Sequence, residues 1–219
     1  IHDTITRRPG SHTQTLAAIR TLAQSSVHVL VSCSVMESNR AGVPDVERQM
    51  TELGVSVSFD GLIRVAQSGD TTPLNTSLDL DGLVDLSLVQ EGEKEACLPS
   101  ETRSDWNSKK NCTAGHMSLY IDPEGVVTPC VAWPESLGDL KKETFKDIWL
   151  RSPRLKQIQR MRQAERSVCQ SCAIKESCNY CAGQSYLHSG EPNEPSPVIC
   201  RANWAQAKAT ARAQGLPDP

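Results

Sequence analysis

The stretch CQSCAIKESCNYC, residues 169–181, places four cysteines within thirteen residues. The chain has nine cysteines, and the others are Cys33, Cys97, Cys112, Cys130 and Cys200. Short Cys-x2-Cys and Cys-x5-Cys spacings let several thiolates point into one pocket, which suits a soft metal or an iron–sulfur cluster. A secreted disulfide scaffold would normally be shorter and would carry an even number of cysteines. The spacing therefore predicts a metal centre and leaves the choice of metal open.

Composition excludes several classes of protein. The 219 residues are 38% hydrophobic and 22% charged, which is typical of a globular chain with one sizeable core or two modest domains. The 23 basic and 26 acidic side chains include no run of five like charges, so we expect no nucleic-acid or membrane surface. No apolar stretch is long enough for a membrane span and no signal sequence opens the chain, so the cytoplasm is the expected location. The first residue is Ile1 rather than Met, which suggests a fragment.

The first sixty residues alternate between helical and strand patterns. Apolar residues at helical spacing predict helices over 11–25 and 44–54. The β-branched run VHVLVSCSVM, residues 27–36, predicts a strand buried on both faces, and residues 55–59 predict a second strand. This order predicts βα units in a parallel sheet, with further partner strands upstream of Ile1. Cys33, inside the first strand, is expected to act as a small buried hydrophobe.

The pattern changes further along. Residues 78–89 fit either a helix or a strand, within a weakly patterned segment that we interpret as a linker or crossover. Residues 117–130 predict a hairpin around the turn Asp-Pro-Glu-Gly, where Gly125 permits a positive φ. Helices interrupted at Pro153 are expected over 142–163, and a last helix over 200–215.

The order of the cysteines resembles a known signature. Cys112-x12-Gly125-x4-Cys130, a gap, Cys169-x2-Cys172-x5-Cys178-x2-Cys181, a second gap and Cys200 resemble the seven-cysteine signature of SPASM domains. These are the auxiliary-cluster domains at the C-terminus of radical S-adenosylmethionine (radical SAM) enzymes. The stretches LYIDPEGVVTPC, LGDLKKETFKDIWLRSPRL and CAGQSYLHSGEPNEP are similar to the hairpin, connecting helices and final loop of that family. HDTITRRPGSHTQTLAAIRTL is similar to the segment after the fourth barrel strand.

The resemblance implies an α/β fold. Residues 1–75 would be the C-terminal part of a partial (β/α) radical SAM barrel, and 76–110 would be a linker. Residues 111–219 would be a cysteine-rich SPASM domain with a β-hairpin and helices.

The resemblance also implies two auxiliary 4Fe-4S clusters. One would use Cys112, Cys130 and Cys181, and the other would use the remaining signature cysteines, Cys169, Cys172, Cys178 and Cys200. Three or four thiolates suffice for each cluster. The first lacks an obvious fourth ligand, which Cys97 could supply; alternatively Cys97 is a surface thiol and the open iron is available to a substrate. S-adenosylmethionine and a third 4Fe-4S cluster are expected in the full-length protein.

SPASM-bearing enzymes mostly act on peptides and proteins, so the resemblance implies a peptide- or protein-modifying oxidoreductase of the ribosomal peptide maturase type. Its partners would be a peptide or protein substrate, a reductant such as flavodoxin or ferredoxin, and a leader-peptide-binding domain in this chain or elsewhere. Sulfatase maturases often have Asp after the cysteine that matches Cys130, and Val131 stands there.

Two departures from the family pattern limit this prediction. Only Asn179 and Tyr180 separate Cys178 from Cys181, whereas the commonest form has three residues there. The chain also lacks the Cys-x3-Cys-x2-Cys motif that holds the catalytic cluster in the family. The chain by itself is therefore expected not to cleave S-adenosylmethionine, and no catalytic residue is assigned.

Other polar residues are weaker candidates. Asp60 and Arg64 follow the strand 55–59, at the end where a parallel barrel keeps its active face, so they are candidates for contacting cofactor or substrate. A solvated loop is the alternative for both. His116 could hydrogen-bond a cluster sulfur or face solvent on the hairpin. The pair His2 and Asp3 is expected to be structural.

Two other classes of protein stay open. Cys-x2-Cys pairs are typical of zinc sites, so a structural or interaction module with four-cysteine zinc sites also fits eight thiolates. A non-catalytic iron–sulfur electron-transfer subunit would fit the same cysteines.

Overall fold

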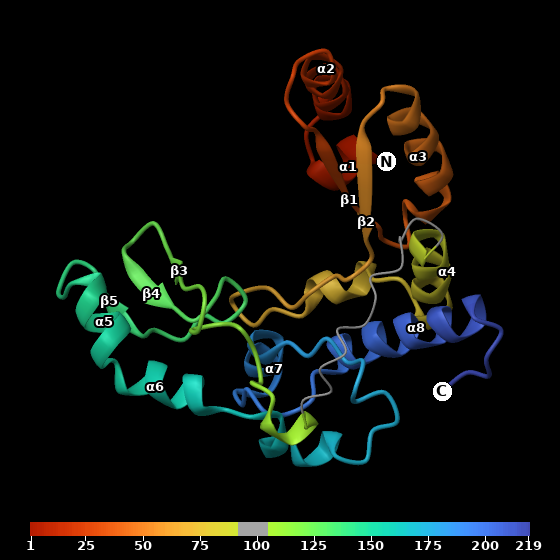
Figure 1. The fold of residues 1–219 in the computed structure, drawn as a ribbon. Helices are drawn as coiled ribbons and strands as arrows, with labels where there is room; N and C mark the ends of the chain where they lie inside the picture. The colour runs from red at the N-terminus through yellow and green to blue at the C-terminus, as the bar shows by residue number, and fades with distance from the viewer. Residues whose placement is uncertain (92–104) are drawn as a thin grey trace.

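Two parallel strands organise the N-terminal part of the computed structural model, which describes residues 1–91 and 105–219. Strand β1 (Leu30–Ser34) pairs with β2 (Ser56–Asp60), with Leu30 opposite Ser56 and Ser34 opposite Asp60. Helix α3 (Val43–Glu52) connects them after the short turn η1 (Arg40–Gly42). The predicted βα unit with parallel strands is therefore present, at the top of Figure 1. Two parallel strands do not make a barrel, so the partial barrel stays a prediction.

Helices cover one face of this strand pair. Helix α2 (Ser11–Ala23), which follows the short α1 (His2–Thr6), packs with α3 around the buried side chains of Ile19, Met50 and Val55. On the other face Leu30 is 62% exposed and Ser32 and Ser34 are exposed. The prediction that this strand is buried on both faces is therefore wrong, because its side chains alternate between a covered and an open face.

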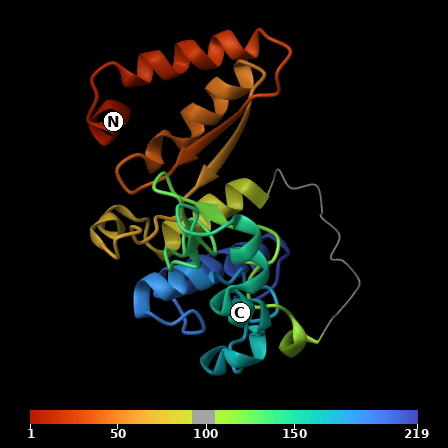
Figure 2. The same ribbon diagram turned by 90° about the vertical axis from the view of Figure 1, so that its left-hand side faces the viewer.

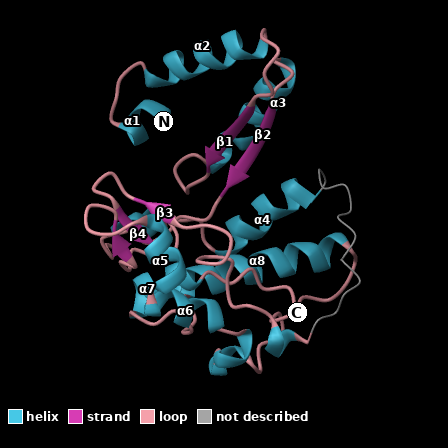
Figure 3. Ribbon diagram, turned by 60° about the vertical axis from the view of Figure 1, so that its left-hand side comes forward, coloured by secondary structure: helices cyan, strands magenta, loops and turns pink. Residues whose placement is uncertain are grey.

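Two helices that are far apart in the sequence pack against each other. Helix α4 (Leu80–Glu91), after the turn η2 (Thr72–Thr76), lies beside α8 (Pro197–Ala213), as Figures 1 and 3 show. Leu83 and Val84 are buried with Ala205 and Ala209 in one core that also contains residues of β2. The segment 78–89 is thus helical rather than extended. Helix α4 lies inside the segment 76–110 that was predicted to be a linker. The domain boundaries at 75 and 110 stay a prediction.

The C-terminal half contains a small antiparallel sheet. Strands β3 (Tyr120–Ile121) and β4 (Val126–Thr128) form the predicted hairpin, and β5 (Gly138–Asp139) pairs with the other edge of β4. Gly125 has φ of 90°, and its N–H donates to the Asp122 carbonyl oxygen at 3.0 Å. The Asp122 carboxylate accepts a bond from the Val126 N–H at 2.8 Å. The turn chemistry predicted from the sequence is confirmed.

Short helices surround this sheet. Thr144 caps α5 (Phe145–Arg151) and Ser152 caps α6 (Pro153–Arg160), so Pro153 separates the two as predicted. Ile148, Leu155 and Trp133 are fully buried in a second core. The remaining elements are η3 (Trp106–Ser108), η4 (Gln163–Glu165), η5 (Ser167–Cys169) and α7 (Ala182–Ser189). Figure 2 shows this half below the lobe of α2 and α3.

Membrane-spanning helices are absent from the part of the chain that the structure describes, since none there combines sufficient length with sufficient apolar character.

Candidate metal centre

Four thiols from three segments surround one cavity. Cys169 ends η5, Cys172 and Cys178 follow in the irregular chain after it, and Cys200 lies in the first turn of α8. All four line the cavity together with Arg166, Tyr180, Ser196 and neighbouring apolar residues. The structure therefore brings together the four cysteines predicted to hold one auxiliary cluster.

Burial makes three of these thiols costly to ionise without a metal. It raises the pKa of Cys169, Cys178 and Cys200 above the ordinary value, and the neighbouring thiols add to this effect. The guanidinium of Arg166 opposes the rise at all three. Metal ligation needs thiolates, so the charge of a bound metal would offset the desolvation.

A second group of thiols lies beside the hairpin. Cys130 follows β4, and burial raises its pKa, which the nearby thiols of Cys181 and Cys112 raise further. The Ala114 N–H donates to the Cys112 sulfur at 3.4 Å, the kind of contact that tunes a metal ligand. Cys112 and Cys130 also pack against the core around Trp133. These are the three cysteines predicted for the other cluster; Cys97, the proposed fourth ligand, lies outside the described residues.

A single metal ion and an iron–sulfur cluster require different arrangements of thiolates. Over residues 1–91 and 105–219, no three Cys, His, Asp or Glu side chains converge on a point that one metal ion could occupy. A tetrahedral zinc site with Zn–S bonds of about 2.3 Å would hold its sulfurs about 3.8 Å apart. A 4Fe-4S cluster instead fills a cavity and takes each thiolate at a different iron. The structure places four thiols around one cavity.

Asp60 and Arg64 are not among the residues that line the cysteine cavity. The Arg64 guanidinium is 3.3 Å from the Asp60 carboxylate, which also accepts a 2.8 Å hydrogen bond from the Leu62 N–H. Asp60 borders a shallow hollow formed with α4 and α8, which shares no lining residue with the cysteine cavity. The structure thus pairs the two candidates with each other at the end of β2.

The remaining candidates have local roles. Cys33 is half-buried against the core of α4 and α8, as expected, and burial raises its pKa. His116 is partly buried, and burial together with the charges of Lys110 and Arg162 lowers its pKa.

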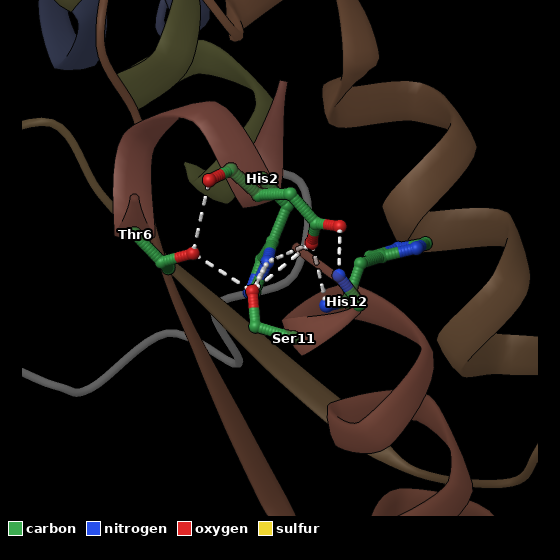
Figure 4. Close-up of polar contacts among 6 residues, drawn as sticks. His2, Thr6, Ser11 and His12 are labelled. Atoms are coloured by element: carbon green, nitrogen blue, oxygen red, sulfur yellow. Dashed lines mark hydrogen bonds and ion pairs between the residues drawn. The ribbon is translucent and has the colours of Figure 1, made fainter. Parts of the chain in front are cut away.

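The pair His2 and Asp3 organises the start of α2. The Asp3 carboxylate accepts hydrogen bonds from the backbone N–H groups of Gly10 at 2.6 Å and His12 at 2.8 Å. Ser11 Oγ donates to the same carboxylate, and His2 Nδ1 lies 3.1 Å from Ser11 Oγ (Figure 4). Gly10, the residue at the cap position, has no side chain for this task. Asp3 therefore caps α2 from a distance, which is the structural role that the sequence suggested.

Sequence reasoning missed Arg166 and Ser196. Both are almost fully buried in the cysteine cavity. The only signal for Arg166 is its position three residues before Cys169, and arginines near a motif are usually on the surface. Tyr180 also lines the cavity: its hydroxyl donates to the Pro192 and Glu194 carbonyl oxygens, and its ring faces Arg166.

Comparison with known proteins agrees with the cysteine geometry. Residues 112–173 match the SPASM family, described as an iron-sulfur cluster-binding domain. Three curated proteins are similar to the chain. The sporulation killing factor maturation protein SkfB of Bacillus subtilis is 26% identical over 153 residues, 67% of this chain and 37% of that protein. The antilisterial bacteriocin subtilosin biosynthesis protein AlbA of the same species is 26% identical over 199 residues, which are 83% of this chain and 42% of the length of AlbA. The AdoMet-dependent heme synthase of Methanosarcina barkeri is 20% identical over 90% of this chain and 62% of its own length.

These matches define the class as an iron–sulfur cluster-binding protein. Residues 112–173 match the SPASM family that the cysteine order resembles, and the three relatives support a radical SAM enzyme with a SPASM domain. The chain spans about two fifths of the length of SkfB and AlbA.

Proposed function

We propose that this chain is part of an oxidoreductase that modifies a peptide or protein after its translation, and that it binds two auxiliary 4Fe-4S clusters. The observation that carries the proposal is the cavity lined by Cys169, Cys172, Cys178 and Cys200. The grouping of Cys112 and Cys181 around Cys130 supports the second cluster. Such clusters supply electron transfer when bound, and the protein holds them through these thiolates.

The relatives support a peptide or protein as the substrate. Two are named for the maturation or biosynthesis of a killing factor and a bacteriocin. The third is named as a heme synthase, so a tetrapyrrole substrate is the competing reading. A reductant such as flavodoxin or ferredoxin, bound S-adenosylmethionine with a third cluster, and a leader-peptide-binding domain belong to the same proposal, as does location in the reducing cytoplasm.

Anaerobic reconstitution tests the cluster assignment. We expect about eight irons and eight acid-labile sulfides per chain, with broad absorption that bleaches on reduction. Cys169→Ala and Cys112→Ala should each remove one cluster, about half of the iron. Cys33→Ala is the matched control, since Cys33 packs against an apolar core and should leave the iron unchanged.

Other results would contradict the assignment. About two zincs per chain without colour would indicate four-cysteine zinc sites instead. Full iron in Cys169→Ala would remove that residue from the ligand set.

A further inference from the structure

Arg166 is a buried cation whose guanidinium nitrogens have no strong hydrogen-bond acceptor among the described residues. It is 1% exposed, and its Nε, Nη1 and Nη2 are all buried without a well-formed hydrogen bond among the described residues, apart from a weak contact with the Cys178 thiol. No ion pair found within residues 1–91 and 105–219 includes it. Burying a charge without compensation is strongly unfavourable, so this guanidinium indicates that an anion belongs beside it.

Two aromatic rings hold the guanidinium in place. Its central carbon lies 4.1 Å from the centroid of the Tyr180 ring and 5.0 Å from that of Trp106. Tyr180 is fixed through its hydroxyl, and Trp106 Nε1 donates to the Lys175 carbonyl oxygen at 3.1 Å. Ring contacts stabilise the cation through its faces but provide no acceptor for its N–H groups. Those groups stay available to the cavity that Arg166 lines.

Thiolates are the only anionic groups among the described residues that line the cavity, and the Glu194 carboxylate acts on Cys169 from outside that lining. Cys169, Cys178 and Cys200 each interact electrostatically with Arg166. Four thiolates around a 4Fe-4S core with two positive charges leave two net negative charges, and reduction adds a third. A fixed cation beside the cluster stabilises the reduced form more than the oxidised form.

We infer that Arg166 donates hydrogen bonds to sulfur atoms of the cluster held by Cys169, Cys172, Cys178 and Cys200, and thereby raises its reduction potential. The inference rests on the proposed function, since it needs that cluster. Ser196 supports it independently: its hydroxyl, at the start of α8, is buried in the same cavity without a partner among the described residues. Two buried donors without a strong acceptor among the described residues therefore line one cavity.

A redox titration of the reconstituted protein tests the inference. Arg166→Gln should make the one-electron reduction of this cluster at least tenfold less favourable, a shift of 59 mV or more to lower potential. The cluster of Cys112, Cys130 and Cys181 is the internal reference and should not move. Arg151→Gln is the matched control, because Arg151 is an exposed arginine paired with Asp147 in the same domain.

Spectroscopy covers the case in which Arg166→Gln does not assemble the cluster. Protein grown with 15N-arginine and then reduced should show a 15N coupling to the cluster electron spin in pulsed electron paramagnetic resonance. Arg166→Lys, which keeps the charge, should lose that coupling.

The outcomes separate the two hypotheses. A wild-type protein that binds no iron would overturn the proposed function. Iron-loaded wild type with no 15N coupling, or an Arg166→Gln variant with full iron and an unchanged potential, would overturn the role of Arg166 alone.

Discussion

Asp3 shows how a single carboxylate can fix the entry of a helix. It accepts backbone hydrogen bonds from His12 and Gly10, and these bonds lower its pKa well below the usual range. Helix α2 has no capping side chain at Gly10, so the carboxylate satisfies N–H groups that would otherwise lack a partner inside the helix. The charged form is therefore the one that the folded state favours.

Asp3→Asn should lower the thermal stability of the N-terminal lobe at neutral pH. Because folding depresses the Asp3 pKa, its contribution is present above the unfolded value of about 4. It should be lost as the pH falls from there through the folded-state pKa. Thermal melts followed by circular dichroism at several pH values check this. Asp45→Asn is the control, because the Asp45 side chain on α3 is exposed. Equal melting temperatures for wild type and Asp3→Asn at pH 7 would contradict the capping role.

The sequence identified the cysteines but not the residues that complete their surroundings. The order of the cysteines carries the resemblance to SPASM domains, and that resemblance implied the two groups of thiols that the structure brings together. Arg166 and Ser196 could not be identified in this way, because their roles depend on being buried without a strong acceptor, and burial is set by segments far apart in the sequence. Trp106, for example, reaches Arg166 from sixty residues upstream.

Among the elements, α7 has a tight contact with the turn that follows β4. A Cβ atom on Gly183 would lie 2.5 Å from the Ala132 carbonyl oxygen and 3.1 Å from the Trp133 nitrogen. This close approach places Cys181, the residue before α7, beside Cys130. Glycine is needed here because the opposing atoms are backbone and cannot rotate away.

Gly183→Ala should therefore push α7 away from the turn. Cys181 would then move away from Cys112 and Cys130, and the cluster that these three residues are proposed to hold would bind less well. We expect iron and sulfide content to fall toward that of Cys112→Ala, with the other cluster retained. Gly42→Ala is the control, since a Cβ atom added there would have no atom within 4 Å and its φ of −87° suits alanine. Full iron content in Gly183→Ala would show that this contact is dispensable.

Element types were predictable where one periodicity dominated. The hairpin, the helices around Pro153 and the βα order all followed from local pattern and turn chemistry. Helix α4 did not, because its leucines fit both periodicities. Packing of Leu83 and Val84 against α8 favours the helix, and that contact joins segments more than a hundred residues apart.

At the scale of the whole molecule, Asp60 and Arg64 lie at the end of β2, next to the hollow between α4 and α8. We propose that they contact cofactor or substrate. In the protein as the cell makes it, Asp60→Asn and Arg64→Gln should each weaken binding of S-adenosylmethionine or of the substrate about tenfold, which corresponds to one charged hydrogen bond. Equilibrium binding measurements check this. Arg48→Gln is the control, because the Arg48 side chain on α3 is exposed. Unchanged affinity for both ligands would assign the pair to a solvated loop.

The first turn of helix α8 places Cys200 in the cysteine cavity, and the rest of the helix packs against α4 at the base of the N-terminal lobe. Its seventeen residues make a rod of about 25 Å. If metal binding at Cys200 changes the packing of α8 against α4, thermodynamic linkage requires the reverse effect. A ligand that repositions the N-terminal lobe then changes the affinity for the metal by the same factor. Cofactor binding at one end of α8 and the position of the N-terminal lobe at the other end would then depend on each other.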